Sequence, residues 1–195
     1  MKPAGRRLLT EVQTELGRVV RYDDESIVHE KWIRQRYDCG CFPSLQPARR
    51  ATVETAWHEA GHAVAALAIG AQFSSASIHH GRSSEGRVHG ICGAEELSFV
   101  VDAAGQVAQR LRTWNMLDCD EELRAWLPTW HSDGGDARRF RAAAARLGGT
   151  EVAVWRHCEQ VLTPLRLHIR EVARALLVHP RYLPYEVIAA VAAVG

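Results

Sequence analysis

The chain is poor in lysine, has no long apolar run and carries no excess of charge of either sign. Only Lys2 and Lys31 are lysines among the 24 basic residues, a bias that we attribute to coding preference rather than to function. With 23 acidic residues the formal net charge is +1, so no overall field indicates a nucleic-acid partner. No apolar run reaches about eighteen residues without a charged or polar break. We therefore expect no nucleic-acid binding and no transmembrane segment.

Cysteines are few and odd in number. The chain has five, which argues against a disulfide framework and favours a reducing compartment. Cys39 and Cys41 are closer together than the usual zinc pair and have no clear second pair, so we interpret them as free thiols in a loop. The basic N-terminus is not followed by an apolar core of about 7 to 15 residues, so we expect no secretory signal. These absences favour a cytoplasmic location.

The most informative feature that is present is the run His58-Glu59-Ala60-Gly61-His62. Residues four apart on an α-helix lie about 40° apart around the axis and about 6 Å along it, so the two imidazoles can converge on one ion. Glu59 then flanks the ion, where it can take a proton from a zinc-bound water of lowered pKa. The run predicts a hydrolytic site with zinc as cofactor, His58 and His62 as ligands and Glu59 as general base.

The flanking residues predict that this run lies on a helix. Thr52 is a candidate N-cap and Gly70 a candidate stop. Gly61 costs roughly 1 kcal/mol relative to alanine in a helix, so it predicts close packing by another segment. An apolar stripe recurs at helical spacing: Val53, Trp57, Ala60, Val64 and Leu67. The alternative is an ordinary core helix whose two histidines only form hydrogen bonds.

A catalytic zinc site normally has three protein ligands and a water, so a third ligand is needed. In one common motif it is a histidine that follows the second one, but Ala65 and Ala68 occupy the required offsets and exclude that class. Glu95 or Glu96, which begin the next apolar-periodic run, could supply it. So could Asp136, where a helix start would favour the charged carboxylate that a metal requires. Ordinary first-turn acids explain these residues equally well, and spacing leaves the choice open.

Several segments then occur in the order known from one protein family. They are His-Glu-Ala-Gly-His-Ala at 58–63, a short strand pair at 77–90, Ala103-Ala104-Gly105-Gln106-Val107-Ala108-Gln109, Ser132-Asp133-Gly134-Gly135-Asp136-Ala137-Arg138-Arg139-Phe140, and closing helices at 162–177 and 183–188. Residues from about 51 to 195 resemble the peptidase domain of the FtsH family, the ATP-dependent zinc metalloproteases of bacterial membranes and organelles. The zinc motif matches at every position, whereas Gln109 stands where that family has glutamate.

This resemblance implies a fold and a set of roles. The fold is expected to be mainly α with a small β-hairpin or short sheet, of the FtsH type. The resemblance selects Asp136 as the third zinc ligand. It also implies that an edge strand containing Val88 and His89 binds an extended protein or peptide substrate by strand addition. His131 could stabilise the oxyanion or replace a ligand, although a histidine in a surface loop is the simpler interpretation.

The chain also departs from that family. It contains no G-x-x-x-x-G-K-[ST] loop, so the ATPase that defines most of the family is missing, as is the membrane anchor. We expect a stand-alone peptidase domain. Without a motor its substrates should be flexible or unfolded chains, unless a separate ATPase or unfoldase docks onto it. The sequence does not indicate an oligomeric state.

The chain divides into two parts. At 47% hydrophobic residues it can bury one good core. We expect residues 1–50 to be an N-terminal extension packing on a domain at 51–195, with a helical rhythm from Leu8 to Val20.

The domain's predicted elements are the zinc helix, a strand pair near 75–91, a helix at about 94–113, a loop with Pro128, a helix from Asp136 to Gly148, a C-terminal helical stretch split at Pro164, and a last short helix from Tyr185. Arg138, Arg139 and Arg141 should occupy an exposed helix face.

The leading functional hypothesis is a zinc-dependent metalloendopeptidase that cleaves flexible or unfolded polypeptides with a metal-activated water. One alternative is a non-catalytic zinc-binding regulator or adaptor, for instance with its cleft occluded by residues 1–50. Another is a structural interaction protein with a vestigial motif. Glu59 favours the enzyme, because metal binding alone needs no general base.

Overall fold

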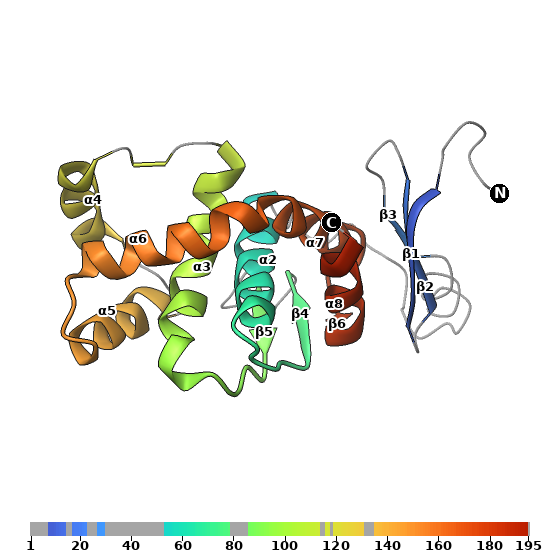
Figure 1. The fold of residues 1–195 in the computed structure, drawn as a ribbon, viewed down its shortest axis with the longest axis horizontal. Coiled ribbons are helices and arrows are strands. Elements are labelled where there is room, and N and C mark those ends of the chain that lie inside the picture. Colours follow the sequence, from blue (N-terminus) through green and yellow to red (C-terminus); the bar gives the residue numbers. More distant parts are fainter. Residues whose placement is uncertain are drawn as a thin grey trace.

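The structure, a computed structural model, describes residues 53–78, 86–113, 116–117, 119–130 and 135–194, together with three N-terminal strands (Figure 1). The described chain is mainly helical with short antiparallel sheets, which confirms the predicted class. Its helices are α2 (Val53–Ala68), α3 (Ser98–Thr113), α4 (Asp120–Trp126), α5 (Asp136–Arg146), α6 (Glu151–Leu162), α7 (Arg166–Val178) and α8 (Tyr185–Val194). Short 3-10 helices, η1 (Glu95–Leu97), η2 (Leu127–Thr129) and η3 (Thr163–Leu165), precede α3, follow α4 and link α6 to α7.

The N-terminal residues form strands, so the helical rhythm predicted there is wrong. β1 (Leu8–Thr14), β2 (Gly17–Tyr22) and β3 (Ile27–His29) pair antiparallel in that order. Val12 lies opposite Val19 in this sheet. β-branched residues alternate along β1 and occur as a pair in β2, a composition that favours strands and competes with a 3.6-residue period. Whether this segment packs on the rest of the chain stays a prediction.

Helix α2 is the centre of the packed region and is buried around most of its circumference. Every residue from Thr55 to Ala66 is buried except His58. The predicted apolar stripe was therefore too narrow, and it was wrong at Val53, which is 44% exposed. The reason is that α3 and α7 both pack against α2 (Figure 1). Its many alanines let these neighbours approach closely.

The contact between α2 and α3 depends on small residues. A Cβ placed on Gly61 would lie 2.5 Å from the Ala104 carbonyl oxygen and 2.6 Å from the Ala108 Cβ. Both distances are shorter than real Cβ contacts, so the two backbones approach each other where both helices carry small residues. The close packing that Gly61 predicted is confirmed. This contact holds the histidine-bearing helix against the segment of α3 that supports the candidate site.

A second sheet borders α2. β4 (Ser75–Ser77) pairs antiparallel with β5 (Arg87–His89) on one side and with β6 (Leu183–Pro184) on the other. Ala76 lies opposite Val88, and the predicted strand pair is thus confirmed. β4 is buried at all three positions, whereas β5 is half-buried or exposed. Among the described strands β5 is therefore an edge strand.

The remaining helices follow the sequence prediction except at one place. The predicted split at Pro164 and the last helix from Tyr185 are both confirmed. Near Pro128, however, we expected a loop, and the structure has α4 running into η2. Three acids in the first turn of α4 favour a helix start, and proline is tolerated in the first turn of η2. Within the described residues, no helix is long and apolar enough to cross a membrane.

Candidate metal centre

Helices α2 and α5 bring two imidazoles and a carboxylate together. His58 and His62 lie one turn apart on α2, and Asp136 is the first residue of α5. One ligand atom from each of the three lies within 4.8 Å of the others. The cluster is well covered, since His62 and Asp136 are buried and the His58 side chain is 19% exposed. Residues 78 positions apart in sequence thus form one compact group of metal-ligand atoms.

The triangle formed by the three atoms fits a tetrahedral zinc ion. The His58 and His62 Nε2 atoms are 3.0 Å apart, and they lie 3.3 and 3.4 Å from Asp136 Oδ2. Ligand atoms about 2.0–2.1 Å from a tetrahedral ion are separated by about 3.3 Å. Two imidazole nitrogens and a carboxylate oxygen are also ligands that zinc accepts. The residues present therefore fit zinc, with one coordination position left for water.

The His62 ring is oriented by the backbone of α3. Its Nδ1 lies 2.6 Å from the Val101 carbonyl oxygen. A carbonyl oxygen only accepts, so Nδ1 must donate and the neutral ring keeps its lone pair on Nε2, facing the cluster. Burial disfavours a charge on this ring, but the hydrogen bond and negative charge of Asp136 outweigh burial and raise the pKa of His62 to about 9.

The Asp136 carboxylate is held from two sides. Burial alone would raise its pKa, but the hydrogen bonds and positive charges of His58 and His62 hold the pKa of Asp136 below its usual range. Oδ2 faces the two rings, whereas Oδ1 accepts from the Arg139 guanidinium one turn along α5. The carboxylate is therefore charged and has a defined orientation, as a metal ligand requires.

Glu59 lies beside the cluster and is buried, at 6% exposure. Its burial raises its pKa, against the opposing positive charges of His62 and His58. A Cβ on Gly86, just before β5, would lie 2.5 Å from Glu59 Cγ and 2.6 Å from Oε1. The start of β5 therefore covers the Glu59 carboxyl. A carboxyl whose pKa is raised in this way can both accept a proton and return it.

The ring of His58 is seated against α3 at a glycine. A Cβ on Gly105 would lie 2.4–2.5 Å from three atoms of that ring. Any larger residue there would push the imidazole away from its present position. The absent side chain of Gly105 thus makes room for the ring of His58.

The edge strand β5 carries the two residues predicted to bind substrate. Val88 is half-buried and packs against the core. The His89 ring nitrogen Nε2 lies 3.2 Å from Ser77 Oγ on the neighbouring strand, so this side chain is directed at β4. Contact of Gly86 with Glu59 places the start of the strand beside the candidate site.

The other ligand candidates are not part of this cluster. Glu95 and Glu96 lie in η1 and are exposed, and neither belongs to the group that could hold a metal among the described residues. His131 lies outside the described residues, so its role stays a prediction.

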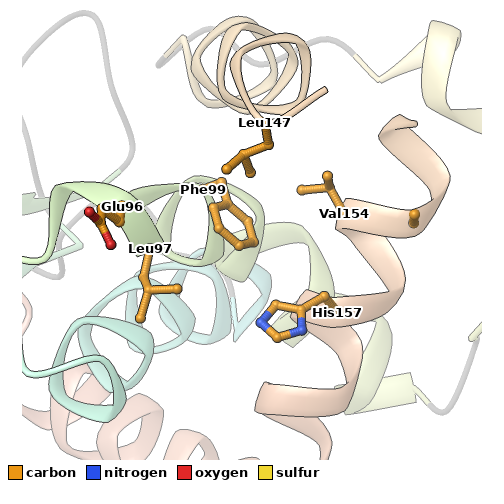
Figure 2. A pocket seen from close by; sticks show the side chains of 7 residues that line it. Glu96, Leu97, Phe99, Leu147, Val154 and His157 are labelled. Atoms are coloured by element: carbon orange, nitrogen blue, oxygen red, sulfur yellow. The ribbon is translucent and has the colours of Figure 1, made fainter. Parts of the chain in front are cut away.

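An open groove of about 460 Å³ lies elsewhere on the molecule (Figure 2). It runs between the start of α3, the end of α5 and α6, and its lining contains none of the cluster's residues. Apart from Glu96 and His157 its walls are apolar. This groove therefore contains none of the possible metal-ligand atoms, which lie at the covered α2–α5 cluster.

Sequence reasoning missed the residues that support the ligands. Arg138 and Arg139 are exposed, as predicted, whereas Arg141 is half-buried. The partners of these arginines were not predicted: the Arg139 Nε donates to Asp102 Oδ1 at 2.7 Å, and Arg141 Nη2 donates to the carbonyls of Leu127 and Trp130. A carboxylate at Asp102 within an otherwise apolar run of α3 was the signal that could have indicated a buried ion pair.

Comparison of the chain with protein-family models and with curated proteins gave no match.

Proposed function

We propose that the chain is a zinc-dependent metalloendopeptidase that cleaves flexible or unfolded polypeptides. The observation that supports it most is the convergence of His58, His62 and Asp136 with a buried Glu59 beside them. Two imidazoles, one carboxylate and an adjacent acid are the elements of a hydrolytic zinc site. The resemblance to the FtsH peptidase domain agrees with this set of residues, and we propose that fold for residues 51–195.

Each residue has a defined task in this proposal. Zinc, when bound, lowers the pKa of a water and polarises the substrate carbonyl. His58 and His62 would hold the ion through their Nε2 atoms, and Asp136 supplies the negative charge. Glu59 accepts the proton from the attacking water and then delivers it to the leaving amine. Its raised pKa suits both steps, because the protonated form is accessible between them.

The substrate would be recognised through its main chain. β5 is an edge strand of its sheet among the described strands, and Gly86, just before it, adjoins Glu59. An extended peptide added beside Val88 and His89 would bring its carbonyl groups past the site with little preference for side chains. Such a mode requires a flexible or unfolded substrate.

The proposal is tested by a paired assay on an unfolded protein substrate. Wild type and Glu59→Gln are incubated with it, and fragments are measured over time. We expect Glu59→Gln to lose about 10²- to 10⁴-fold in rate while it keeps its zinc, because glutamine cannot accept the proton. The matched control is Glu54→Gln on the same helix, an exposed acid paired with Arg112, which should cleave like wild type. Equal fragment yields from wild type and Glu59→Gln would reject the peptidase and leave a zinc-binding regulator.

A further inference from the structure

One stretch of α3 contacts two of the three candidate ligands and reaches the third through Arg139. The Val101 carbonyl accepts from His62, and Gly105 seats the ring of His58. Between them Asp102 accepts from Arg139, which in turn donates to Asp136. The five residues from 101 to 105 thus set the direction of every ligand side chain, two of them directly and the third through Arg139.

The Arg139 guanidinium bridges two carboxylates that belong to different helices. Its Nε donates to Asp102 Oδ1 at 2.7 Å, and its Nη2 donates to Asp136 Oδ1. The side chains of Asp102 and Asp136 are only 13% and 10% exposed, whereas Arg139 is 51% exposed. The two inner carboxylates carry like charges that repel each other, and the guanidinium between them offsets that repulsion. Both bonds come from different nitrogens of a rigid planar group, so they fix its orientation.

The bridge determines which Asp136 oxygen faces the rings. Arg139 occupies Oδ1, which leaves Oδ2 at 3.3 and 3.4 Å from the Nε2 atoms of His58 and His62. Asp136 is the first residue of α5, and it follows Gly135, a left-handed residue that gives no side-chain cap. A carboxylate in that place needs a partner to hold its rotamer.

We propose that Arg139, anchored by Asp102, is a positioning residue that directs the Asp136 carboxylate at the metal and thereby sets metal affinity. This inference rests on the metal site of the proposed function and goes beyond it. Electrostatics alone would give the opposite effect, because a positive charge close to the site repels a divalent cation. The sign of the change in zinc affinity on loss of Arg139 therefore separates positioning from charge.

The test is a zinc titration in competition with a chromophoric chelator, on the full chain. Arg139→Gln should bind zinc about 10- to 100-fold more weakly than wild type, the usual effect of losing a residue that orients a ligand. The Co²⁺-loaded variant should also show an altered visible absorption, because the coordination geometry changes. The matched control is Arg138→Gln, the exposed neighbour on the same helix, which should leave both readouts unchanged.

Arg139→Lys keeps the positive charge but not the two directed donors, so it tests the geometry of the bridge separately from its charge. It should still bind zinc several-fold more weakly than wild type, and it serves as the deciding variant if Arg139→Gln does not fold. Asp102→Asn combined with Arg139→Gln should be no weaker than Arg139→Gln alone, because both act through the same carboxylate. A purely structural bridge would lower thermal stability without changing affinity or the Co²⁺ spectrum.

The outcomes separate this inference from the proposed function. Affinity equal to or above that of wild type in Arg139→Gln, or equal affinity in Arg139→Lys, overturns the positioning role and leaves the metal site standing. A wild-type protein that binds no zinc overturns both. Zinc binding with the expected loss in Arg139→Gln, but no cleavage by wild type, supports the positioning role and rejects only the peptidase.

Discussion

The two sides of α3 are built on opposite principles. Beside α2 it presents small residues and polar groups, with Ala104 and Ala108 against Gly61 and a glycine against the ring of His58. On its other side, toward α5 and α6, bulky aromatic rings pack together. Trp126 and Trp130 stack at 5.9 Å between ring centroids, and Trp155 meets both edge-on. In the first region the helix backbones lie close enough together to orient the candidate ligand side chains. In the second region large side chains fill the core.

The buried polar groups of the two regions also differ in the contacts that they make. On the aromatic side the buried Glu159 accepts from Trp155 Nε1 and from Arg156, both at 2.7 Å, and Arg156 also pairs with Asp120. The Glu159 carboxylate is thus held in place by the neighbouring side chains that donate to it. Beside α2, three possible metal-ligand atoms lie within 4.8 Å of one another and face one another. The comparison teaches that stability is concentrated in the aromatic region and chemistry in the small-residue region.

The largest expected effect on stability separates the two regions. Trp155→Ala removes a side chain with no exposure that joins Trp126, Trp130 and Phe140, and should cost about 3–5 kcal/mol of unfolding free energy. Because none of these contacts reaches a ligand, zinc affinity measured well below the unfolding temperature should not change. Chemical denaturation and zinc titration check the two statements. Leu147→Ala, at a residue 48% exposed, is the control and should change stability by less than about 0.5 kcal/mol. A large loss of zinc affinity in Trp155→Ala would remove the division between the regions.

A smaller loss of stability is expected at the contact between α2 and α3. In Gly61→Ala the new methyl group would lie 2.5 Å from a backbone oxygen, which cannot move without shifting a helix. We expect a net loss of about 1–3 kcal/mol, since overpacking outweighs the better helix propensity of alanine. Thermal unfolding measures it. An unchanged or raised unfolding temperature would mean that the helices can separate here at little cost.

Gly105→Ala should act on the ligand more than on the fold. Its methyl group would lie 2.4 Å from the ring of His58, a side chain that is partly exposed and can rotate away. We expect weaker zinc binding, about 10-fold, with a smaller change in unfolding temperature than in Gly61→Ala. The two alanine variants are controls for each other, and the reverse ranking would contradict the assignment of roles to the two glycines.

The stability of the metal-free protein should depend on pH through His62. The pKa of His62 is raised to about 9 in the folded state, above its ordinary value of 6.5. A raised folded-state pKa contributes stability that is fully present below about 6.5 and is lost as pH rises through about 9. In the presence of a chelator the unfolding temperature should therefore fall across this window. His62→Gln should lose this dependence, and a wild-type temperature that rises across the window would contradict the Asp136–His62 interaction.

Local patterns were enough to predict most helices from residue 53 onward. Pro164 and the residues around Tyr185 marked real boundaries, because proline acts on its own backbone and immediate neighbours. The pattern failed for β1 and β2, where an apolar period compatible with a helix competed with β-branched residues. It also missed α4, whose acidic first turn follows a segment without apolar rhythm.

The site was less accessible to local reasoning. His58 and His62 could be paired from their spacing, since one helix relates them. Asp136 could be selected among the possible third ligands only through the family resemblance, because no local rule relates it to a helix about 70 residues earlier. The bridge from Asp102 through Arg139 was missed, since tertiary packing alone brings those two residues together.

The most direct test of the account is the metal content of protein purified without added zinc. Elemental analysis of wild type should give about one zinc per chain, and Asp136→Ala, with one of three ligands removed, should retain little. The matched control is Asp120→Ala, an exposed acid on the aromatic side, which should keep the wild-type content. Wild-type protein without zinc that also fails to take it up on titration, or full zinc content in Asp136→Ala, would contradict the central claim.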